Sequence, residues 1–417
     1  MTAVDVSVQL PSGTEIPAGV LREEPSPTGG APFVSFRYHA EYLAAPGSYA
    51  LSPELHLDTG LQRPPVHRPM FLGFEDAGPD RWGRDLLQEE ERLLARHDGR
   101  PYGRLSALDS LLRVSDSTRQ GAVRFWSDGA PLGRSALPDR VDTVDWPRLL
   151  AAAADAEAGR NVAAALEILF QFGSASPGGA RPKVQVTDDS GSLWLAKVPA
   201  HGDRWDVSLW EEVTLTLAAR AGIRVPPHRL ERVGEGRSIL LLRRFDREDG
   251  RRIGYRSART LLQLDDHEID RRSYTDLAGA LRRTASTEDV HELFRRVAFT
   301  LLVGNLDDHM RNHGLLRTKT GWRLSPMFDV NPHWGSGFDS TPIVPSGPTR
   351  RREIHELLDV ADAFDLSTDT AMTILREVEY ATRDWAATAI GAGAEQENLE
   401  PFAALFDGPA RDWVRNR

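Results

Sequence analysis

The sequence predicts an α+β fold with a mixed α/β N-terminal lobe and a mostly α-helical C-terminal lobe. Short runs that alternate apolar with polar residues recur in the first part of the chain, and this two-residue period is typical of strands. Beyond Tyr274 apolar residues recur instead at three- and four-residue steps, which is the period of amphipathic helices. At 417 residues the chain is too long for one ordinary core, so more than one packed unit is expected.

The N-terminal region is expected to form a small α+β unit. Alternation from Val4 onward predicts a first strand. Further strands are predicted at Pro32–Tyr38 and 49–55, and helices at Arg81–Arg96 and Leu105–Leu112.

A polar stretch and a long helical pattern follow. Ser127–Val144 contains Gly and Pro without periodicity, which predicts a linker or surface loop. The apolar residues of Trp146–Phe172 recur at helical spacing, which predicts an amphipathic helix.

The remaining elements are predicted in the order β, β, α, β, β and then mostly helices. The first five are Lys183–Thr187, Leu193–Val198, Ser208–Ala221, Arg229–Val233 and Ser238–Arg244, and the helices are Tyr274–Arg283, Thr287–Asn305, Ile354–Ala363 and Asp369–Trp385. Three regions are therefore expected: an N-terminal subdomain at 1–144, a small lobe at 145–250 and a helical lobe at 251–417.

Composition limits the classes of function. Lys and Arg total 51 against 61 Asp and Glu, a net charge of −10, which argues against a whole surface built for nucleic acid. The chain has no cysteine, so disulfides, thiolate catalysis and cysteine-ligated zinc are excluded. Apolar runs such as Val297–Val303 are far shorter than the ~18 residues of a membrane span, and the N-terminus is unlike a secretory signal. We therefore expect a cytoplasmic protein with no membrane association.

A glycine-rich segment, GSASPGGARPK, runs from Gly173 to Lys183. Glycines let the backbone approach a phosphate closely, and successive N–H groups form an anion-binding concavity. The segment fits neither the Walker loop nor GxGxxG, and a flexible turn between domains is the alternative.

A lysine ends the following apolar strand, at Lys197 in LWLAKVPA. A strand lysine that faces a cleft pairs with the α- and β-phosphates of ATP in kinases, where a helix glutamate holds it. Glu211 lies on the next predicted helix, and the adjacent Glu212 is the alternative partner. For an isolated strand lysine, however, a solvated position is the commoner explanation.

The segment GNLDDHMRN, Gly304 to Asn312, follows the longest C-terminal helical pattern. Phosphoryl transfer to an alcohol uses a carboxylate for the hydroxyl proton and an Asn a few residues later for magnesium, and Asp307 and Asn312 have that spacing. The alternative is a helix end with ordinary polar residues. His309 and His313 have helical spacing, but the Glu of H-E-x-x-H is missing, so a histidine metal site is not favoured.

A second carboxylate, Asp329, follows Met-Phe in LSPMFDVNPH. The arrangement is similar to the kinase motif in which one aspartate chelates the metal that bridges the phosphates. A lone Phe-Asp pair is more often a strand end or a turn, so its weight comes from its place shortly after Asp307.

Taken together, these segments resemble the HipA-like serine/threonine kinases, the toxins of bacterial toxin–antitoxin modules. Phe71–Leu87 (FLGFEDAGPDRWGRDLL) and Ala107–Phe125 (ALDSLLRVSDSTRQGAVRF) are similar to N-terminal motifs of that family. SPGGARPK, LAK, LLLRRFDR (Leu240–Arg247) and NLDDHMRN are similar to its loop, ATP lysine, hinge and catalytic loop. The resemblance implies a protein-kinase-like fold of two lobes, with ATP and Mg²⁺ as cofactors.

The resemblance also implies residue roles. Asp307 is the catalytic base, with His309 near the phosphates and Lys197 on them, while Asn312 and Asp329 bind the metal. The implied nucleotide-binding residues are Ser176, Gly178, Gly179, Ala180, Lys183, Lys197, Glu211, Arg243, Phe245, His309, Asn312 and Asp329. Family members switch themselves off by autophosphorylation of a loop serine, which corresponds to Ser176.

The implied partners are a HipB-like helix-turn-helix antitoxin, DNA mainly through the antitoxin complex, and a protein substrate such as a glutamyl-type aminoacyl-tRNA synthetase. Two residues depart from the archetypal pattern: Arg243 replaces an acid and Asp308 replaces a glycine. The extra carboxylate at Asp308 either raises the pKa of Asp307 by like-charge repulsion or points to solvent.

Two other functions remain open from the sequence. The same base, metal ligands and lysine serve phosphotransferases that act on small alcohols or sugars. A nucleotide-binding corepressor without chemistry is the other alternative, although the intact Asp307, Asn312 and Asp329 argue against it.

Overall fold

The computed structural model describes residues 2–26, 29–134, 138–174, 181–234, 236–265, 272–334, 340–345 and 352–417. The chain folds into two compact units. Unit 1 comprises Met1–Asp203, Leu241–Arg256 and Arg317–Lys319, and unit 2 comprises Arg204–Leu240, Ser257–Leu316 and Thr320–Arg417. Both units are discontinuous in sequence, whereas the predicted regions 1–144, 145–250 and 251–417 follow the chain; that division stays a prediction.

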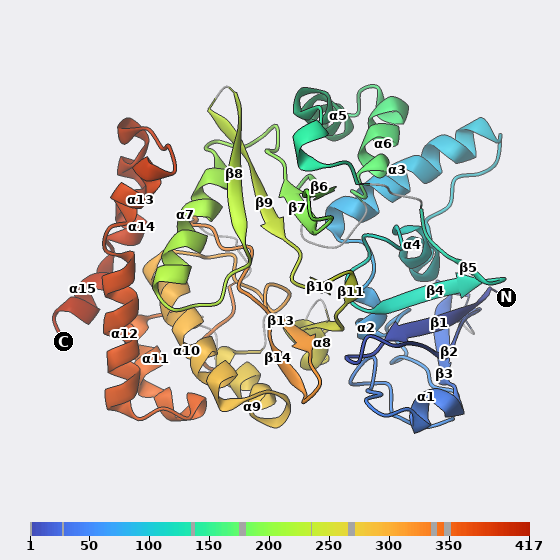
Figure 1. The fold of residues 1–417 in the computed structure, drawn as a ribbon, viewed down its shortest axis with the longest axis horizontal. Coiled ribbons are helices and arrows are strands. Elements are labelled where there is room, and N and C mark those ends of the chain that lie inside the picture. Colours follow the sequence, from blue (N-terminus) through green and yellow to red (C-terminus); the bar gives the residue numbers. More distant parts are fainter. Residues whose placement is uncertain are drawn as a thin grey trace. The chain divides into compact units, whose positions relative to one another are not determined.

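Unit 1 combines sheets with helices (Figure 1). Its elements are β1 (Ala3–Gln9), β2 (Glu15–Glu24), β3 (Phe33–Tyr38), α1 (Ala40–Ala44), α2 (Leu72–Glu75), α3 (Arg81–His97), α4 (Ala107–Arg113), β4 (Val123–Ser127), β5 (Ala130–Pro131), α5 (Trp146–Ala158), α6 (Val162–Gln171), β6 (Lys183–Thr187), β7 (Leu193–Lys197), β10 (Arg247–Glu248) and β11 (Arg251–Arg252). The strand β9 (Arg237–Arg243) begins in unit 2 and ends in unit 1.

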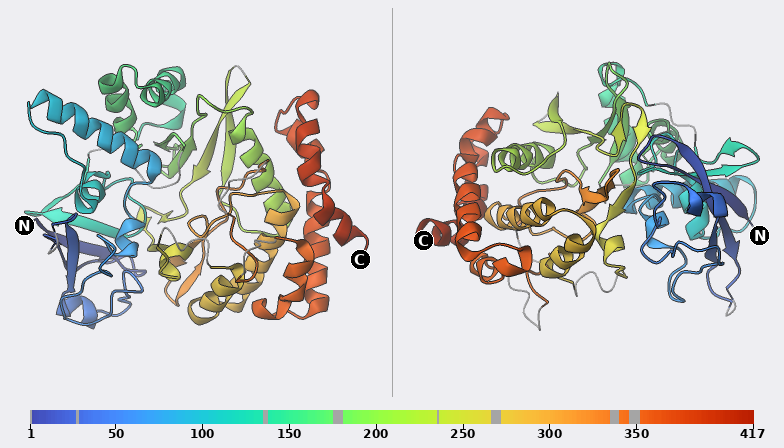
Figure 2. Two further views of the ribbon diagram at one scale, coloured as in Figure 1. Left: turned by 180° about the vertical axis from the view of Figure 1, so that it is seen from behind. Right: turned by 60° about the horizontal axis from the view of Figure 1, so that its bottom comes forward.

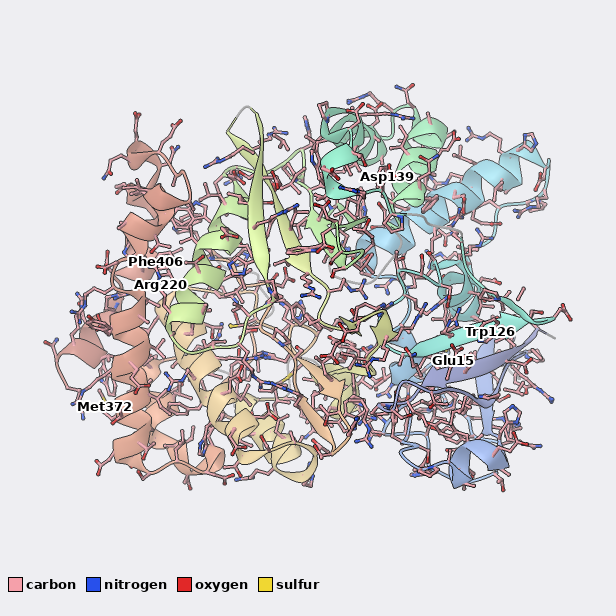
Figure 3. All side chains as sticks on the ribbon, viewed as in Figure 1. Glu15, Trp126, Asp139, Arg220, Met372 and Phe406 are labelled. Atoms are coloured by element: carbon pink, nitrogen blue, oxygen red, sulfur yellow. The ribbon has the colours of Figure 1, made fainter. Side chains whose placement is uncertain are left out.

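The N-terminal sheet of unit 1 is antiparallel, in the order β3-β2-β1-β4-β5. Alternate residues of β1, including Val4, Val6 and Val8, are buried, as expected for a sheet with one face on a core. On β1 the Ser7 hydroxyl accepts a hydrogen bond from Trp126 Nε1 on β4 (2.7 Å) and donates one to Glu15 at the start of β2; Glu15 and Trp126 are labelled in Figure 3.

A buried charge network ties two distant segments of unit 1 together. Asp246 is 1% exposed and accepts hydrogen bonds from the guanidinium groups of Arg244 and Arg247 and from Gly121 N–H (2.8 Å). Arg247 Nη2 also donates to Arg119 O (2.5 Å). Burial alone would raise the pKa of Asp246, but the two arginines hold it well below its ordinary value. The Arg-Phe-Asp-Arg motif therefore holds the segment around Gly121.

Unit 2 is mainly helical (Figure 2). Its elements are α7 (Val207–Arg220), β8 (His228–Gly234), α8 (Ala258–Leu261), α9 (Tyr274–Thr284), α10 (Thr287–Leu302), β14 (Trp322–Leu324), α11 (Ile354–Asp359), α12 (Thr368–Thr382), α13 (Trp385–Gly391), α14 (Glu400–Phe406) and α15 (Pro409–Arg415). The strands β12 (Tyr255–Ser257) and β13 (Gly314–Arg317) form a small sheet with β14, and both include residues of unit 1 at one end.

The core of unit 2 surrounds α10. Its apolar face, which includes Val290, Phe294 and Val297, is fully buried together with residues of α7, α9 and α12. Ser273 and Ser286 begin α9 and α10 with reciprocal capping boxes, which satisfy backbone N–H groups that have no partner inside a helix. Among the residues described, no helix is long and apolar enough to cross a membrane.

Most predicted elements are confirmed, and two are wrong. Residues 49–55 do not form a strand, because their backbone is bonded by side chains instead: Tyr42 Oη donates to Tyr49 O (2.6 Å), and Leu51 N–H donates to Tyr38 Oη (2.9 Å). Trp146–Phe172 forms two helices, α5 and α6, because the chain turns at Gly159 with a φ of +66°. That left-handed conformation ends a helix and favours glycine.

The last residues of three predicted helices also differ. The helix predicted at Ile354–Ala363 ends at Asp359, and a separate 3₁₀ helix spans Ala361–Phe364. α10 ends at Leu302 rather than Asn305, since Gly304 has a φ of +67°. The segment predicted as one helix from Asp369 to Trp385 ends at Thr382, and Trp385 begins α13.

The network around Asp246 generates a stability prediction. We expect Asp246→Asn to lower the free energy of unfolding by about 3–5 kcal/mol, because it leaves buried arginines without their carboxylate. Urea unfolding monitored by circular dichroism measures the change. Asp249→Asn changes an exposed carboxylate three residues away and is expected to leave stability unchanged; equal midpoints for the two variants would contradict the role given to Asp246.

Candidate functional site

The predicted catalytic loop lies in unit 2 between α10 and β13. Gly304 ends the helix in the left-handed conformation, and the residues from Asn305 to His309 form no regular secondary structure. Side chains in such a segment must be held by individual hydrogen bonds, because no helix or sheet ladder fixes the backbone.

Asp307 is held at both of its backbone polar groups. Its N–H donates to Asn305 Oδ1 (3.3 Å), and its carbonyl accepts from Asn312 Nδ2 (3.1 Å). Asp307 is half-buried. The predicted base and the predicted metal ligand Asn312 are therefore directly linked, through the Asn312 amide and the Asp307 backbone.

Asp308 lies in a different environment from its neighbour. It is 3% exposed, with Oδ1 3.1 Å from His313 Nε2, and Oδ2 accepts a hydrogen bond from Tyr274 Oη. Burial would raise the pKa of Asp308, but the charges of His313 and Arg352 and the hydrogen bonds lower it to about 2. The expectation that this carboxylate points to solvent is wrong; it is a buried anion beneath the loop.

Asp329 lies in a strained turn that helix α7 holds. Its φ is +59°, a left-handed conformation that Asp tolerates better than most residues. Asp329 N–H donates to Glu211 Oε1 (3.1 Å), and Thr214 Oγ1, one helical turn further along α7, donates to Val330 O (2.5 Å). Asn331 Nδ2 lies 3.5 Å from Glu211 Oε2. Strain of this kind persists only where surrounding groups over-determine it.

Glu211 rather than Glu212 therefore faces the turn of Asp329. Glu211 is 1% exposed, while Glu212 Oε1 lies 3.6 Å from His228 Nε2. Burial raises the pKa of Glu212.

The two loops are hydrogen-bonded to each other. His333 N–H donates to Gly304 O (3.0 Å), Thr341 N–H donates to Asp308 O (2.9 Å), and Ser340 Oγ donates to Leu306 O. The chain that follows Asp329 thus holds the backbone of the segment that carries Asp307.

The residues present fit a magnesium ion better than a transition metal. Asn312 uses Nδ2 as a donor, which leaves its amide oxygen, and Asp329 carries a carboxylate; both are the hard oxygen ligands that Mg²⁺ prefers. Within the described ranges no group of three or more His, Asp or Glu converges as a metal site. The buried polar atoms here that have no hydrogen-bond partner in the described part of the chain include Asn305 Nδ2, His309 Nδ1 and Asn331 Oδ1, which is typical of a site that receives polar ligands or water.

The other predicted residues lie in unit 1. Lys197 ends β7 opposite Lys183 on β6 and is 9% exposed. Lys183 Nζ forms an ion pair with Asp80, the residue that caps α3 through a hydrogen bond from Gly83 N–H (2.6 Å). Burial raises the pKa of Asp80 and Lys183 opposes that shift. The structure thus joins Lys183 to the Pro-Asp-Arg-Trp-Gly segment; its role at a nucleotide stays a prediction.

The hinge residues form the end of β9 and the turn after it. Arg243 is exposed, and its guanidinium donates to Ser192 Oγ (3.1 Å). Arg244 N–H donates to Leu193 O (2.8 Å), and the Phe245 ring lies 6.3 Å from that of Tyr255. Ser176, Gly178, Gly179 and Ala180 lie outside the described residues.

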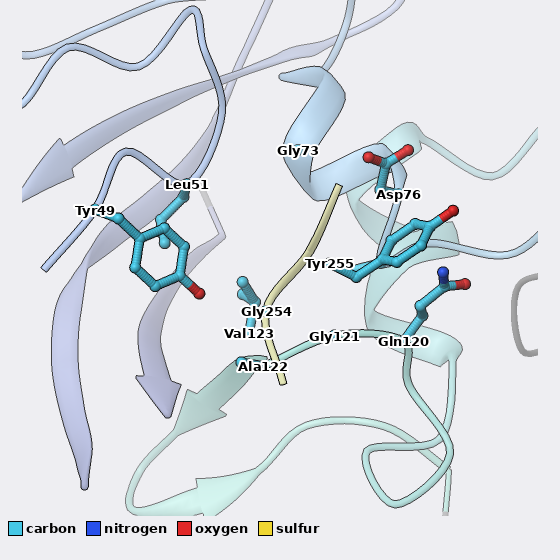
Figure 4. A pocket seen from close by; sticks show the side chains of 11 residues that line it. Tyr49, Leu51, Gly73, Asp76, Gln120, Gly121, Ala122, Val123, Gly254 and Tyr255 are labelled. Atoms are coloured by element: carbon cyan, nitrogen blue, oxygen red, sulfur yellow. The ribbon is translucent and has the colours of Figure 1, made fainter. Parts of the chain in front are cut away.

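Unit 1 also contains a small cavity, whose lining residues differ from the predicted site residues (Figure 4). Tyr49 lies on one side of it, while Asp76, Gln120 and Tyr255 lie together on the other. Burial raises the pKa of Tyr255, and the Asp76 charge raises it further. None of the predicted site residues lines this cavity, so it is not the candidate active site.

Comparison with known proteins agrees with the motifs. The model of the HipA-like C-terminal domain family matches residues 175–386, slightly more than half of the chain. The chain belongs to this family. The matched residues include every predicted catalytic and metal-binding side chain of this HipA-like protein.

Individual relatives are more distant. The HipA-like chain is 30% identical over 159 residues to Y4dM, a candidate kinase of Sinorhizobium fredii (strain NBRC 101917 / NGR234). That match covers 34% of the chain and 38% of Y4dM, little more than a third of the relative's length.

Among solved structures, the fold is similar to HipA from the complex of HipA, HipB and operator DNA of the Shewanella oneidensis MR-1 toxin–antitoxin system. The TM-score is 0.62 at 15% sequence identity, and the match covers 99% of both chains. At this identity the likeness establishes the fold alone, and it confirms the predicted α+β, kinase-like fold. The Helicobacter pylori proinflammatory kinase CtkA is matched with a TM-score of 0.41, which is too low to establish a shared fold.

Sequence reasoning missed several residues that hold the HipA-like site. The sequence pattern indicates no partner for Asp308, and it does not point to Tyr274, Thr214 or Arg352. Only the spacing of Thr214 indicates a role, since it lies three residues after Glu211 and therefore on the same helix face. Arg352 has no such signal, because nothing in its local sequence indicates what it contacts.

The turn at Asp329 generates a second prediction. We expect Thr214→Val to lower the free energy of unfolding by about 1–3 kcal/mol, because the isosteric side chain leaves the buried Val330 carbonyl without its donor. Chemical denaturation measures the loss. Thr214→Ser keeps the hydroxyl and is the matched control; a valine variant as stable as the serine variant would show that the bond contributes nothing.

Proposed function

We propose that this HipA-like chain is an ATP- and Mg²⁺-dependent serine/threonine protein kinase. One observation carries the proposal: the loop that holds Asp307 and Asn312 is hydrogen-bonded to the chain that follows Asp329. Phosphoryl transfer to an alcohol requires a carboxylate for the hydroxyl proton and oxygen ligands for the metal. Those are the side chains that the two loops carry.

Each residue then has a distinct task. Asp307 accepts the proton of the attacking hydroxyl, and its fixed backbone orients the carboxylate. Asn312 and Asp329 hold Mg²⁺, which when bound neutralises charge on the phosphates. Lys197 provides an ammonium for the α- and β-phosphates, Glu211 is its carboxylate partner, and the His309 ring lies near the phosphates.

The nucleotide contacts extend the proposal to unit 1. Ser176, Gly178, Gly179, Ala180 and Lys183 form the phosphate-binding segment, and the backbone of Arg243 to Phe245 meets adenine. The bonds that Arg244 and Arg247 make to Asp246 support this role for the hinge backbone, because they commit both arginine side chains elsewhere.

The biological role proposed is that of a toxin in a type II toxin–antitoxin module in the cytoplasm. The solved HipA structure of similar fold contains HipB and operator DNA, which supports a HipB-like antitoxin as partner. The net charge of −10 favours DNA contact mainly through that antitoxin. The proposed substrate is an aminoacyl-tRNA synthetase, glutamyl-type by the family resemblance, whose phosphorylation would arrest translation.

The first test is phosphate transfer from labelled ATP with magnesium in host lysate. We expect Asp307→Asn to lower the rate by about 10²–10⁴-fold, the range for loss of a positioned general base. Asp329→Asn is expected to lose activity while remaining folded, because Asn also tolerates the left-handed conformation.

Asp5→Asn, which changes an exposed carboxylate of β1, is the control and should retain full activity. Equal background labelling by wild type and Asp307→Asn, with ATP bound by both, would indicate a nucleotide-binding corepressor instead. Labelling of a purified metabolite panel but of no protein would indicate a small-molecule phosphotransferase.

Autophosphorylation gives a separate prediction. After incubation with ATP and magnesium, we expect mass spectrometry to find one phosphate on Ser176. The charge of that phosphate would oppose the nucleotide phosphates and so switch the kinase off. Ser176→Ala should then lack that phosphate and keep a constant rate, whereas the wild-type rate declines. A phosphate that appears equally in Asp307→Asn would show that it is not self-catalysed.

A further inference from the structure

A buried network below the catalytic loop has no role in the chemistry described so far. Its members are Tyr274 at the start of α9, Asp308 in the loop, His313 before β13, and Arg352 before α11. Tyr274 is fully buried, and Asp308 and His313 are nearly so. They come from three segments of unit 2 that are far apart in the sequence, since Asp308 and His313 lie in the same loop.

The network is centred on the Asp308 carboxylate. One oxygen accepts from Tyr274 Oη and the other lies 3.1 Å from His313 Nε2. A buried anion is costly unless it is paired and hydrogen-bonded, so Asp308 keeps this position only while both partners stay in place. Its backbone carbonyl is held independently by Thr341 N–H.

Arg352 connects the carboxylate to the other end of the loop. Its Nη1 donates to Asn305 O (3.0 Å), while its Nη2 lies within hydrogen-bond distance of Tyr274 Oη (3.4 Å) and Thr300 Oγ1 (3.3 Å). Asn305 in turn accepts from Asp307 N–H through Oδ1 (3.3 Å).

Two routes therefore lead from Arg352 to Asp307. One passes through Asn305 to the Asp307 N–H. The other passes through the Tyr274 hydroxyl to the Asp308 side chain, and Asp308 is joined to Asp307 by the peptide bond. The guanidinium, with its rigid fork of donors, fits a role that bonds two acceptors at a fixed separation.

We propose that Tyr274, Asp308 and Arg352 are positioning residues that set the orientation of Asp307 for phosphoryl transfer. The proposal rests on the kinase function proposed above. None of the three touches the reacting atoms in this account; they act through the loop backbone. Misplacement of a reacting group by about 1 Å costs roughly 10²-fold in rate, so the network is expected to affect kcat rather than ATP binding.

The test compares two buried tyrosines. Tyr274→Phe removes the donor to Asp308, and Tyr42→Phe removes an equally buried hydroxyl that donates to Tyr49 O in unit 1. Each variant loses a buried hydroxyl that both donates and accepts a hydrogen bond, but only the first belongs to the network. Arg352→Lys is the second network variant, because a single ammonium cannot reproduce the fork.

Steady-state phosphate transfer is measured for each purified variant, with the folded fraction from thermal unfolding. We expect Tyr274→Phe and Arg352→Lys to lower kcat by about 10- to 10²-fold with the KM for ATP within about twofold of wild type. Tyr42→Phe should keep kcat per folded molecule. A Tyr274→Phe kcat equal to that of Tyr42→Phe, or a loss explained by the unfolded fraction, would overturn the proposal.

Hydrogen exchange of the loop peptide provides a readout that does not depend on activity. We expect faster exchange at residues 305–313 in Tyr274→Phe and Arg352→Lys than in wild type and Tyr42→Phe, because the loop backbone loses its anchor. If exchange is faster in the two network variants but the wild type transfers no phosphate, the kinase function is refuted, while the anchoring of the loop by the network is supported. Unchanged exchange with an active wild type would refute the anchoring alone.

Discussion

The candidate site depends on the pairing of buried carboxylates in segments without regular secondary structure. Asp308 and Glu211 are both buried, and each accepts hydrogen bonds from groups distant in the sequence. Because an uncompensated buried charge is strongly unfavourable, each carboxylate fixes the groups around it. Asp308 fixes the loop that carries Asp307, and Glu211 fixes the strained turn of Asp329.

The division of labour between Asp307 and Asp308 follows from burial. Adjacent aspartates in one loop could repel each other, but Asp308 is compensated by His313, Tyr274 and Arg352, and its pKa of about 2 keeps it ionised at neutral pH. Hydrogen bonds hold the backbone N–H and carbonyl of the half-buried Asp307, and its carboxylate is the proposed base. Two identical side chains thus serve as anchor and as proposed base.

Sequence patterns predicted the elements whose signals are local. The strand Lys183–Thr187 was predicted to the residue, and α9 to within one, because alternation and capping are encoded by neighbours. Residues 49–55 failed because tyrosine side chains from elsewhere bond their backbone. The order of Asp307, Asn312 and Asp329 also follows from short motifs. The position of Arg352 does not, since it is defined by contacts with Thr300 and Asn305, about fifty residues earlier.

The network also gives a physical reason why the departure from the archetype is tolerated. A glycine at position 308 has no charge to compensate and needs neither the tyrosine hydroxyl nor the guanidinium. An aspartate there is stabilised by the Tyr274 hydroxyl, which donates to it, and by the charges of His313 and Arg352, and loss of the hydroxyl leaves a buried acceptor unsatisfied. The residues at 274, 308 and 352 therefore act as one unit, and a change at one of them is expected to depend on the identity of the other two. The anchor of this loop is thus distributed over three segments of unit 2, although in the proposed chemistry Asp307 alone accepts the hydroxyl proton.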